Sequence, residues 1–453
     1  MVCRIFYGQN SLARLGIPRT KPAAGACRGR RDHETSWAAG ERAGRQVSRV
    51  NFVALAFALP GWRFFVLVIA VIPFAYYIAA TLSALRFFLR ERGRENAPYT
   101  PAVSLLKPVR GVDFSSYENF VSFCTQDYAD YEILFGVADL TDPAVPLIQR
   151  LIAEFPQRRI RLLVGSEELG SNRKVNKLAR LAREAQHDVL ALTDGDVRVG
   201  PEYLHEVAAP FADKKVGAVT SFYRGIAEKN LGAELEAVGA ASDFFAGVLM
   251  ANWMEGITFG LGASIVTTKE WIARIGGFAA IADMHSDDYE LGHRIAKADG
   301  KVLLSREAVW TMYPAQTARG FWQHQVRWAR TVRLCRPLSF AGLIFTHGLP
   351  WAVLAALIAP APQIAAAYLL AYLGLRLAMA WTVGVWGVRD DVLRGKLWLV
   401  PLRDAIYFVV WLASFGSNRI HWGGEEFRME KGRLVPAASA QSSVAETATN
   451  SHR

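Results

Sequence analysis

DVLALTDGD (188–196) is the stretch that decides the expected fold, because its apolar run is short and ends in two aspartates. A run of this length, bounded by turn residues, indicates a buried strand. Three other runs share this character: VSLLKP (103–108), YEILFGVAD (131–139) and IRLLVG (160–165). Amphipathic stretches that indicate helices lie between the strands, at 142–155 and 176–185. Strands that alternate with helices predict an α/β domain with a mostly parallel sheet, which we place at 101–335.

Three aspartates lie at the ends of these expected strands, where ligands gather in parallel α/β sheets. Asp139 ends one strand, and Asp194 and Asp196 follow another in the sequence TDGD. Two carboxylates one residue apart could hold a hard divalent cation such as Mg²⁺ or Mn²⁺, which would leave coordination sites for a diphosphate. A plain turn explains TDGD equally well, since Asp-Gly is a common turn pair.

A further aspartate is the candidate base. The stretch MHSDDYELGHRIAKADG predicts the start of a helix, with Asp287 and Asp288 near its amino end. The helix dipole favours anions there, which is a sufficient structural explanation for both residues. The functional hypothesis makes Asp288 a general base that removes a proton from an acceptor hydroxyl. Asp142, which precedes a proline, is by contrast expected to cap a helix.

Basic and small residues could bind the phosphates and the sugar. In HQVRWARTVR, Arg327 and Trp328 could belong to an interfacial helix, or the guanidinium could bind phosphate oxygens. Lys174, in SNRKVNK, is either a phosphate partner or part of a solvated helix start. The stretch FGLGASIVT holds Gly262, where a sugar could approach the backbone closely, although it could also be only a tight strand.

Apolar segments flank the domain on both sides. The region 52–88 is long enough to cross a hydrocarbon core of roughly 30 Å as a helix. After the domain, the region 338–416 holds three candidate membrane segments: about 340–360, 364–386 and 398–415. Arg376 and Arg403 interrupt the last two, so these segments could be interfacial or re-entrant instead of simple spans.

Charge is concentrated at one end of the 453-residue chain. Residues 1–50 hold ten Lys or Arg and three acids, against a net charge of +11 for the whole chain. The remainder is only mildly basic, which argues against a nucleic-acid-binding core. The basic segment 1–48 and the Ala-, Ser- and Thr-rich segment 434–453 are expected to be disordered tails.

Two further patterns bear on the compartment. Four arginines follow the first apolar segment and by the positive-inside rule place the domain on the cytoplasmic face: Arg86, Arg90, Arg92 and Arg94. The basic segment 1–48 before the apolar segment argues for the opposite orientation, and we give the four arginines more weight. The cysteines show no CxxC spacing and no His cluster nearby, so neither a disulfide framework nor a zinc site is suggested.

Seven short motifs occur in one order within the domain: KPVRGVD, VADLTDPA, SNRKVN, TDGDVRV, LGAS, SDDY and HQVRW. In this order and spacing the chain resembles the ceramide glucosyltransferase family, glycosyltransferase family twenty-one, and the related bacterial hopanoid-associated glycosyltransferases. The resemblance implies a GT-A fold with one membrane helix before the domain and about three after it. It also implies a UDP-sugar donor and inversion at the anomeric carbon.

The resemblance assigns a role to each aspartate. Asp139 matches the family's first aspartate, near the nucleotide. Asp194 matches the second, and Asp196 completes a DxD-like metal site. Asp288 matches the third, which is the base.

The motif (Q/R)xxRW is matched at its end by Arg327 and Trp328, whereas His324 stands where the family has Gln or Arg. The expected function is the metal-dependent, inverting transfer of a hexose, with glucose as the first candidate, from a UDP-sugar to a hydroxyl of a membrane lipid. Lys174 and Arg327 would stabilise the departing diphosphate. The alternatives are a hopanoid-lipid N-acetylglucosaminyltransferase, a processive polysaccharide synthase, and a non-catalytic membrane scaffold with a degenerate transferase domain.

Overall fold

The structure is a computed structural model that describes residues 60–92, 99–422, 425–430 and 433–436. The tail expected at 1–48 lies outside the described residues, as do residues 52–59 of the expected membrane helix. Of the tail expected at 434–453, residues 437–453 also lie outside them.

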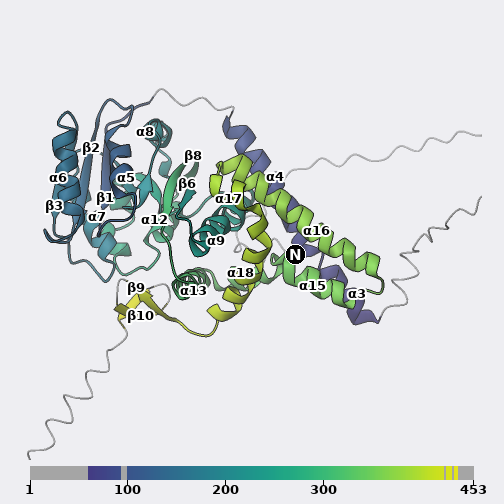
Figure 1. The fold of residues 1–453 in the computed structure, drawn as a ribbon. Helices are drawn as coiled ribbons and strands as arrows, with labels where there is room; N and C mark the ends of the chain where they lie inside the picture. Colours follow the sequence, from purple (N-terminus) through teal and green to yellow (C-terminus); the bar gives the residue numbers. More distant parts are fainter. Residues whose placement is uncertain (1–59, 93–98, 423–424, 431–432, 437–453) are drawn as a thin grey trace, which may run out of the picture.

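A mixed sheet of eight strands forms the centre of the domain, in the order β3-β2-β1-β4-β7-β6-β8-β5 (Figure 1). The four strands that the sequence predicted form one half of this sheet and pair in parallel. They are β1 Val103–Pro108, β2 Tyr131–Val137, β3 Arg159–Val164 and β4 Val189–Thr193. The predicted parallel α/β arrangement is therefore confirmed.

The second half of the sheet was not predicted, apart from the possible strand around Gly262. It consists of β5 Val197–Arg198, β6 Val216–Ala227, β7 Ser264–Thr268 and β8 Lys301–Tyr313. β7 runs antiparallel to both of its neighbours, β4 and β6, and β5 runs antiparallel to β8. Because β6 and β8 pair in parallel, the sheet as a whole is mostly parallel, as expected.

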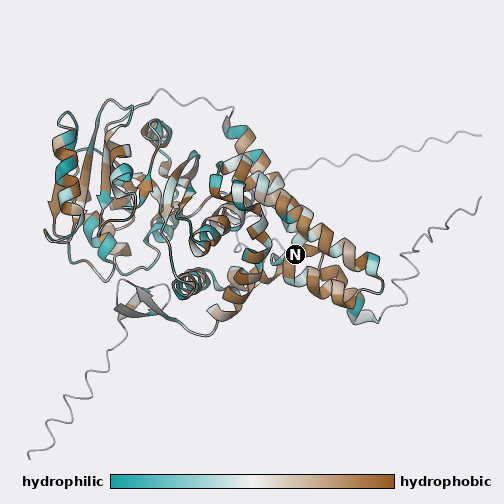
Figure 2. Ribbon diagram, in the orientation of Figure 1, coloured by the Kyte–Doolittle hydropathy of each residue, from teal (hydrophilic) through white to brown (hydrophobic). Residues whose placement is uncertain are grey.

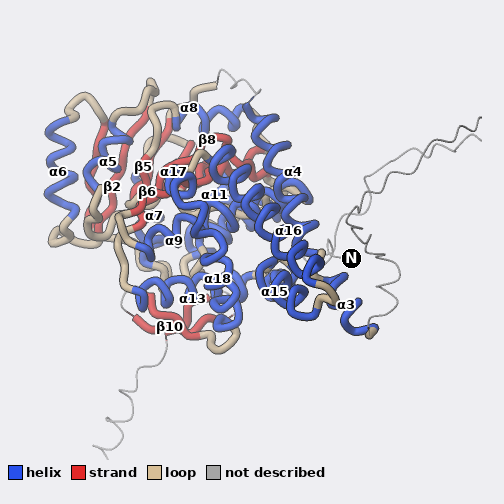
Figure 3. Tube along the Cα trace, turned by 45° about the vertical axis from the view of Figure 1, so that its right-hand side comes forward, coloured by secondary structure: helices blue, strands red, loops and turns tan. Residues whose placement is uncertain are grey.

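Helices cover both faces of the sheet (Figure 3). On one face lie α5 Ser116–Cys124, α6 Ala144–Glu154 and α8 Tyr203–Ala208; on the other lie α7 Arg173–Glu184, α11 Lys269–Arg274 and α12 Asp287–Lys297. Successive side chains of β1 point to opposite faces, so Leu105 and Leu106 belong to two different apolar clusters. Both predicted helical stretches are helices, α6 and α7.

Within the described residues, four helical segments are long and apolar enough to cross a membrane, one before the domain and three after it. They are Gly61–Glu91 (α3 Gly61–Ile69 and α4 Ile72–Arg92), Pro337–Ile358 (α14 Pro337–Gly342, η4 Leu343–Phe345 and α15 Gly348–Ile358), Pro362–Val388 (α16 Pro362–Ala380 and η5 Trp381–Val388) and Asp391–Ser414 (α17 Asp391–Lys396, η6 Leu397–Leu399 and α18 Val400–Ser414). Figure 2 shows the apolar helices α3, α15 and α16 extending away from the sheet. This arrangement confirms the predicted fold class.

Further helices join the domain to these segments, namely α9 Leu231–Gly239, η2 Ala240–Phe244, α10 Phe245–Met254 and α13 Ala318–Cys335. α10 packs against α4, and α13 packs against α18. A small antiparallel sheet follows, formed by β9 Arg419–Trp422, β10 Glu425–Glu430 and β11 Arg433–Pro436. Residues 434–436, which the sequence placed in a tail, belong to β11.

The two arginines that interrupt the apolar segments point into the protein. Arg376 is 1% exposed and its guanidinium pairs with Asp404, which also accepts a hydrogen bond of 2.9 Å from the Tyr372 hydroxyl. Arg403 is also buried and donates to the Gln325 side chain at 2.7 Å. Because both side chains point into the protein and away from the hydrocarbon, they do not prevent these helices from crossing a bilayer.

Arg376→Leu is expected to destabilise the protein by about 3 kcal/mol, because it leaves the Asp404 carboxylate buried without its cation. Unfolding in detergent, followed by temperature or denaturant, measures this loss. The control is Arg394→Ala, which breaks an exposed pair with Asp391 and should change stability by less than about 0.5 kcal/mol. Equal effects of the two substitutions would contradict a structural role for the buried pair.

Candidate active site

A cavity of about 700 Å³ opens where β1 and β4 end, and it continues to the apolar helices. Seven of the eight predicted site residues line it: Lys174, Asp194, Asp196, Gly262, Asp288, Arg327 and Trp328. They come from five different elements or loops, so the fold brings together residues that are far apart in the sequence. Asp139 is not part of the cavity wall.

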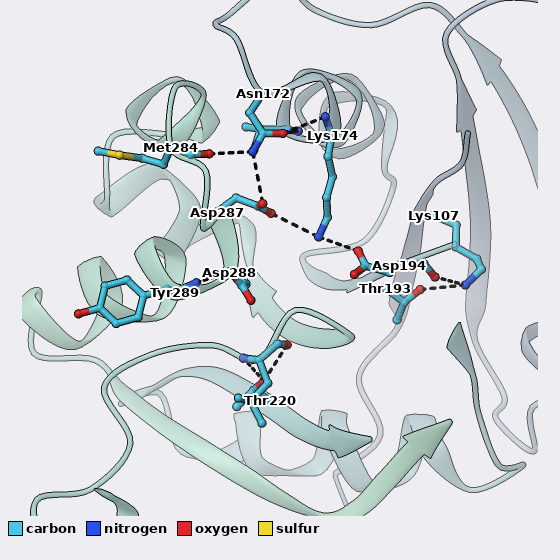
Figure 4. A network of polar contacts seen from close by, with 12 residues as sticks. Lys107, Asn172, Lys174, Thr193, Asp194, Thr220, Met284, Asp287, Asp288 and Tyr289 are labelled. Carbon is cyan, nitrogen blue, oxygen red and sulfur yellow. Dashed lines mark hydrogen bonds and ion pairs between the residues drawn. The ribbon is translucent and has the colours of Figure 1, made fainter. Parts of the chain in front are cut away.

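Lys174 connects the two halves of the sheet at this cavity (Figure 4). Its ammonium group lies 2.6 Å from Asp194 Oδ1, at the end of β4, and 3.4 Å from Asp287 Oδ2, at the start of α12. Burial alone would lower the pKa of Lys174, but Asp194, Asp287 and Asp288 outweigh it and raise that pKa. Lys174 therefore stays charged. Sequence reasoning missed the role of Asp287, which it explained by the helix dipole alone.

Asn172 fixes the position of Lys174. Its side-chain oxygen accepts from the backbone N–H groups of Lys174 at 3.0 Å and Val175 at 3.2 Å, which caps α7. Its amide nitrogen donates to the Met284 carbonyl at 2.8 Å and to Asp287 at 3.3 Å. One side chain thus caps the helix and ties it to the segment that leads into α12.

Lys107 is a second residue whose role the sequence did not reveal. Its side chain is fully buried and donates to the Asp194 carbonyl at 2.7 Å, so it holds the turn that follows β4. Burial lowers the pKa of Lys107 to about 7, and the nearby Asp196 and Asp194 oppose this change. The available signal was a lysine inside a mostly apolar strand, which is rare unless the charge has a partner.

Asp194 and Asp196 form a pair of carboxylates at the cavity wall. Burial, and next the charge of Asp194, raise the pKa of Asp196 to about 7. In the described part of the chain, no group of three or more His, Cys, Asp or Glu side chains is placed to hold a metal ion. The pair still suits a divalent cation that takes its other ligands from a diphosphate and water, the usual mode for Mg²⁺.

Asp288 lies at the amino end of α12 and faces this pair. A Cβ atom built on Gly262 would lie 2.8 Å from Asp288 Oδ2 and 3.8 Å from Asp194 Oδ2, so only glycine leaves this space open. Asp288 Oδ1 accepts a hydrogen bond of 2.8 Å from the Tyr289 backbone N–H. Burial, and next the charge of Asp287, raise the pKa of Asp288 to about 6, although Lys174 lowers it.

Arg327 provides a guanidinium in the same cavity. No hydrogen bond or ion pair engages this guanidinium within the residues that the structure describes, which leaves it available for an anion. Burial lowers the pKa of Arg327 below its usual value, and the nearby Glu236 opposes the shift. The position of Arg327 therefore fits the predicted contact with phosphate oxygens.

His324, the residue that departs from the family motif, is a structural link. Its Nδ1 atom lies 2.8 Å from Glu236 Oε1 on α9, and its Nε2 atom accepts a hydrogen bond of 2.9 Å from the Trp328 indole. This arrangement suits a neutral ring with its proton on Nδ1. His324 thus orients Trp328 toward the cavity but does not line the cavity itself.

Asp139 and Asp142 lie together beyond the edge of the cavity. The Asp139 carboxylate accepts hydrogen bonds from the backbone N–H and the hydroxyl of Thr141, and these bonds lower the pKa of Asp139. Asp142 accepts from the Ala144 backbone N–H at 2.9 Å, which agrees with the expected helix cap, and from the Gly111 N–H at 2.9 Å. Binding of a nucleotide by Asp139 stays a prediction.

The family model described as Glycosyl transferase family 21 matches residues 65–435. Ceramide glucosyltransferase 1 of Caenorhabditis elegans is 24% identical over 266 residues, which are 56% of this chain and 57% of the relative. The ceramide glucosyltransferase of Candida albicans is 34% identical over 110 residues, or 21% of this chain and 20% of the relative. The chain thus spans little more than half, or less, of these relatives.

Two solved structures are similar at low identity. A mannosyltransferase from Pyrobaculum calidifontis, in complex with GDP-Man and Mn²⁺, is 17% identical with a TM-score of 0.43, and the match covers 77% of this chain and 99% of that one. GalNAc-T7, with UDP, GalNAc and Mn²⁺, is 12% identical with a TM-score of 0.37, and the match covers 54% and 52%.

Asp196→Asn is expected to stabilise the protein at pH 8 by about 1–2 kcal/mol, with a smaller gain at pH 5. The folded-state pKa of Asp196, about 7, lies above the unfolded value. The wild type therefore loses stability as pH rises toward 7, whereas a neutral amide does not. Unfolding in detergent at both pH values measures the gain, and a gain that does not depend on pH would contradict this origin.

Proposed function

The chain belongs to glycosyl transferase family 21, and we propose that it transfers a hexose, glucose first among the candidates, from a UDP-sugar to a hydroxyl of a membrane lipid such as ceramide. A single observation carries this proposal. One cavity holds Lys174, Arg327 and the carboxylates of the site, Asp194, Asp196 and Asp288, at one end, and three of the four candidate membrane segments contribute to its wall. A charged, water-soluble donor fits the first end, and a lipid can enter the second from the bilayer.

Asp288 is the proposed general base. The acceptor hydroxyl gives its proton to the Asp288 carboxylate while its oxygen forms a bond to the anomeric carbon. The bond between that carbon and the phosphate oxygen breaks, and the electron pair leaves with UDP. Attack from the face opposite UDP inverts the anomeric carbon. A pKa near 6 keeps Asp288 largely ionised at neutral pH and still basic enough to accept the proton.

Lys174 and Arg327 are the proposed stabilisers of the leaving diphosphate. Both are cationic at the cavity wall, and developing negative charge in such a half-buried site is stabilised strongly. A divalent ion at Asp194 and Asp196 would supply further positive charge to the diphosphate. Asp287 holds Lys174 in place and leaves Asp288 free for the proton.

The basic flanks of the membrane segments support a cytoplasmic catalytic domain. Arg86 and Arg90 are exposed near the end of α4, where Phe88 packs against Trp386 of η5 with ring centroids 6.1 Å apart. The end of η5 is followed by three more basic residues, Arg389, Arg394 and Lys396. Positive charges from two spans thus gather at one end of the helices, the pattern that marks cytoplasmic flanks.

The product tests the function directly. Membranes that contain the protein, incubated with ceramide and labelled UDP-glucose or UDP-N-acetylglucosamine, are expected to form a lipid that carries one hexose, most efficiently from UDP-glucose. Removal of divalent ions with EDTA should lower the rate at least about 10-fold, and Mn²⁺ or Mg²⁺ should restore it. A polymer would indicate a processive synthase, and the absence of any transfer would contradict the proposal.

Asp288→Asn is expected to lower kcat by about 10³-fold and to leave UDP-sugar binding intact, since the amide cannot accept the proton. The same substitution at Asp299 is a matched control, because this exposed residue has φ 64°, which Asn tolerates well. In the wild type, kcat/KM should fall as pH decreases through about 6, where Asp288 becomes protonated. Turnover that survives in Asp288→Asn would exclude Asp288 as the base.

A further inference from the structure

The membrane end of the cavity contains a carboxylate to which no role has been assigned. The cavity wall at this end includes Tyr76 from α4, Leu343 from η4 and Tyr407 from α18. Residues of η2 and α10 also contribute to it. In the described part of the chain, Asp243 is the one charged side chain that these elements contribute to the wall. An ionisable group among apolar, membrane-bordering helices is costly and is a candidate for function.

Asp243 is available to a ligand. The structure shows no hydrogen bond or ion pair to the Asp243 carboxylate from any described residue, although the side chain is half-buried. Burial raises the pKa of Asp243, and the positive charges of Arg376 and Arg403 oppose that rise without contacting the carboxylate. The carboxylate oxygens are not fully buried, so they are open to the cavity and can accept a hydrogen bond from a molecule that enters it.

Asp243 lies in an irregular helical turn. Residues Ala240–Phe244 form a single π-helical turn between α9 and α10, and such turns occur often at functional sites. Arg376 fixes this turn, since its guanidinium donates to the Ser242 carbonyl at 3.0 Å and to the Ser242 hydroxyl at 3.2 Å. Arg376 belongs to the membrane helix α16. This helix therefore helps to orient Asp243, which follows Ser242 in the chain.

We propose that Asp243 binds the polar head of the lipid acceptor by accepting a hydrogen bond from a hydroxyl or amide N–H other than the reacting hydroxyl. This inference deepens the proposed function and rests on it. Arg376 and Arg403 already balance the charges of Asp243 and Asp404, so a neutral donor fits this place better than a cationic amine. The contact would hold the acceptor near the surface of the bilayer, with its reacting hydroxyl directed toward Asp288.

The test compares the kinetics of acceptor and donor. With short-chain ceramide, Asp243→Ala should raise the acceptor KM by about 10-fold or more, and the isosteric Asp243→Asn by less, because hydrogen bonds to charged groups are the stronger ones. The KM for UDP-glucose and its binding measured by calorimetry should not change. Asp213→Ala, which removes an exposed carboxylate paired with Lys301, is the matched control and should leave both KM values unchanged.

Acceptor analogues identify the group that Asp243 binds. Ceramide that lacks the secondary hydroxyl, and ceramide whose amide is N-methylated, are compared in the wild type and in Asp243→Ala. For the analogue that lacks the bound group, the two proteins should show equal KM values, so that the substitution no longer matters.

Three results would overturn the inference. An unchanged acceptor KM in a folded Asp243→Ala protein removes the contact. A raised KM for UDP-glucose instead shows that Asp243 binds a hydroxyl of the donor sugar. In the third result, the wild type forms lipid product, but Asp243→Ala raises the KM for both analogues as well. Asp243 then has a structural role and does not bind either group. If the wild type neither binds ceramide nor transfers sugar to it, the proposed function fails as well.

Discussion

The ion pair between Lys174 and Asp194 is the contact on which the rest of the site depends. The cavity wall carries Asp194, Asp196, Asp287 and Asp288, and four carboxylates so close together would repel one another. Lys174 relieves this repulsion by contacting Asp194 and Asp287 at once. The four carboxylates thereby lie in different electrostatic environments. Two are partners of a cation, and two, Asp196 and Asp288, keep raised pKa values.

A second dependence couples this chemistry to the membrane helices. Two buried arginines link the membrane helices to the elements that line the cavity. Arg376 of α16 donates a hydrogen bond to the backbone of η2, and Arg403 of α18 donates one to a side chain of α13. α13 also carries Arg327 and Trp328, and η2 carries Asp243. The same arginines that interrupted the apolar segments therefore position the wall of the cavity. A lipid-binding end and a phosphate-binding end are held by one polar network.

The sequence predicted the first half of the sheet well and the second half poorly, for physical reasons. β1 to β4 are short, apolar and separated by amphipathic helices, so local patterns are sufficient. β6 and β8 carry polar residues in SFYRGIA and SREAVWT, because only part of each strand is buried, and their pairing contains irregular registers. The ion pair between Lys174 and Asp287 could not be predicted from local patterns either, since 113 positions separate the two residues. The helix dipole had already offered a sufficient local explanation for Asp287.

The different outcomes for Asp139 and Asp194 follow from topology. Both end a parallel strand, so the sequence placed them alike. In the order β3-β2-β1-β4, the chain moves outward from β1 and then returns to the other side, which makes the gap between β1 and β4 the switch point. Ligands enter the crevice at such a point. Residues after β1 and β4, such as Asp113 and Asp194, therefore line the cavity, while Asp139 lies one strand away. A nucleotide that extends from the crevice across β1 toward β2 would bring its base to Asp139. Its diphosphate would then lie near the divalent ion proposed at Asp194.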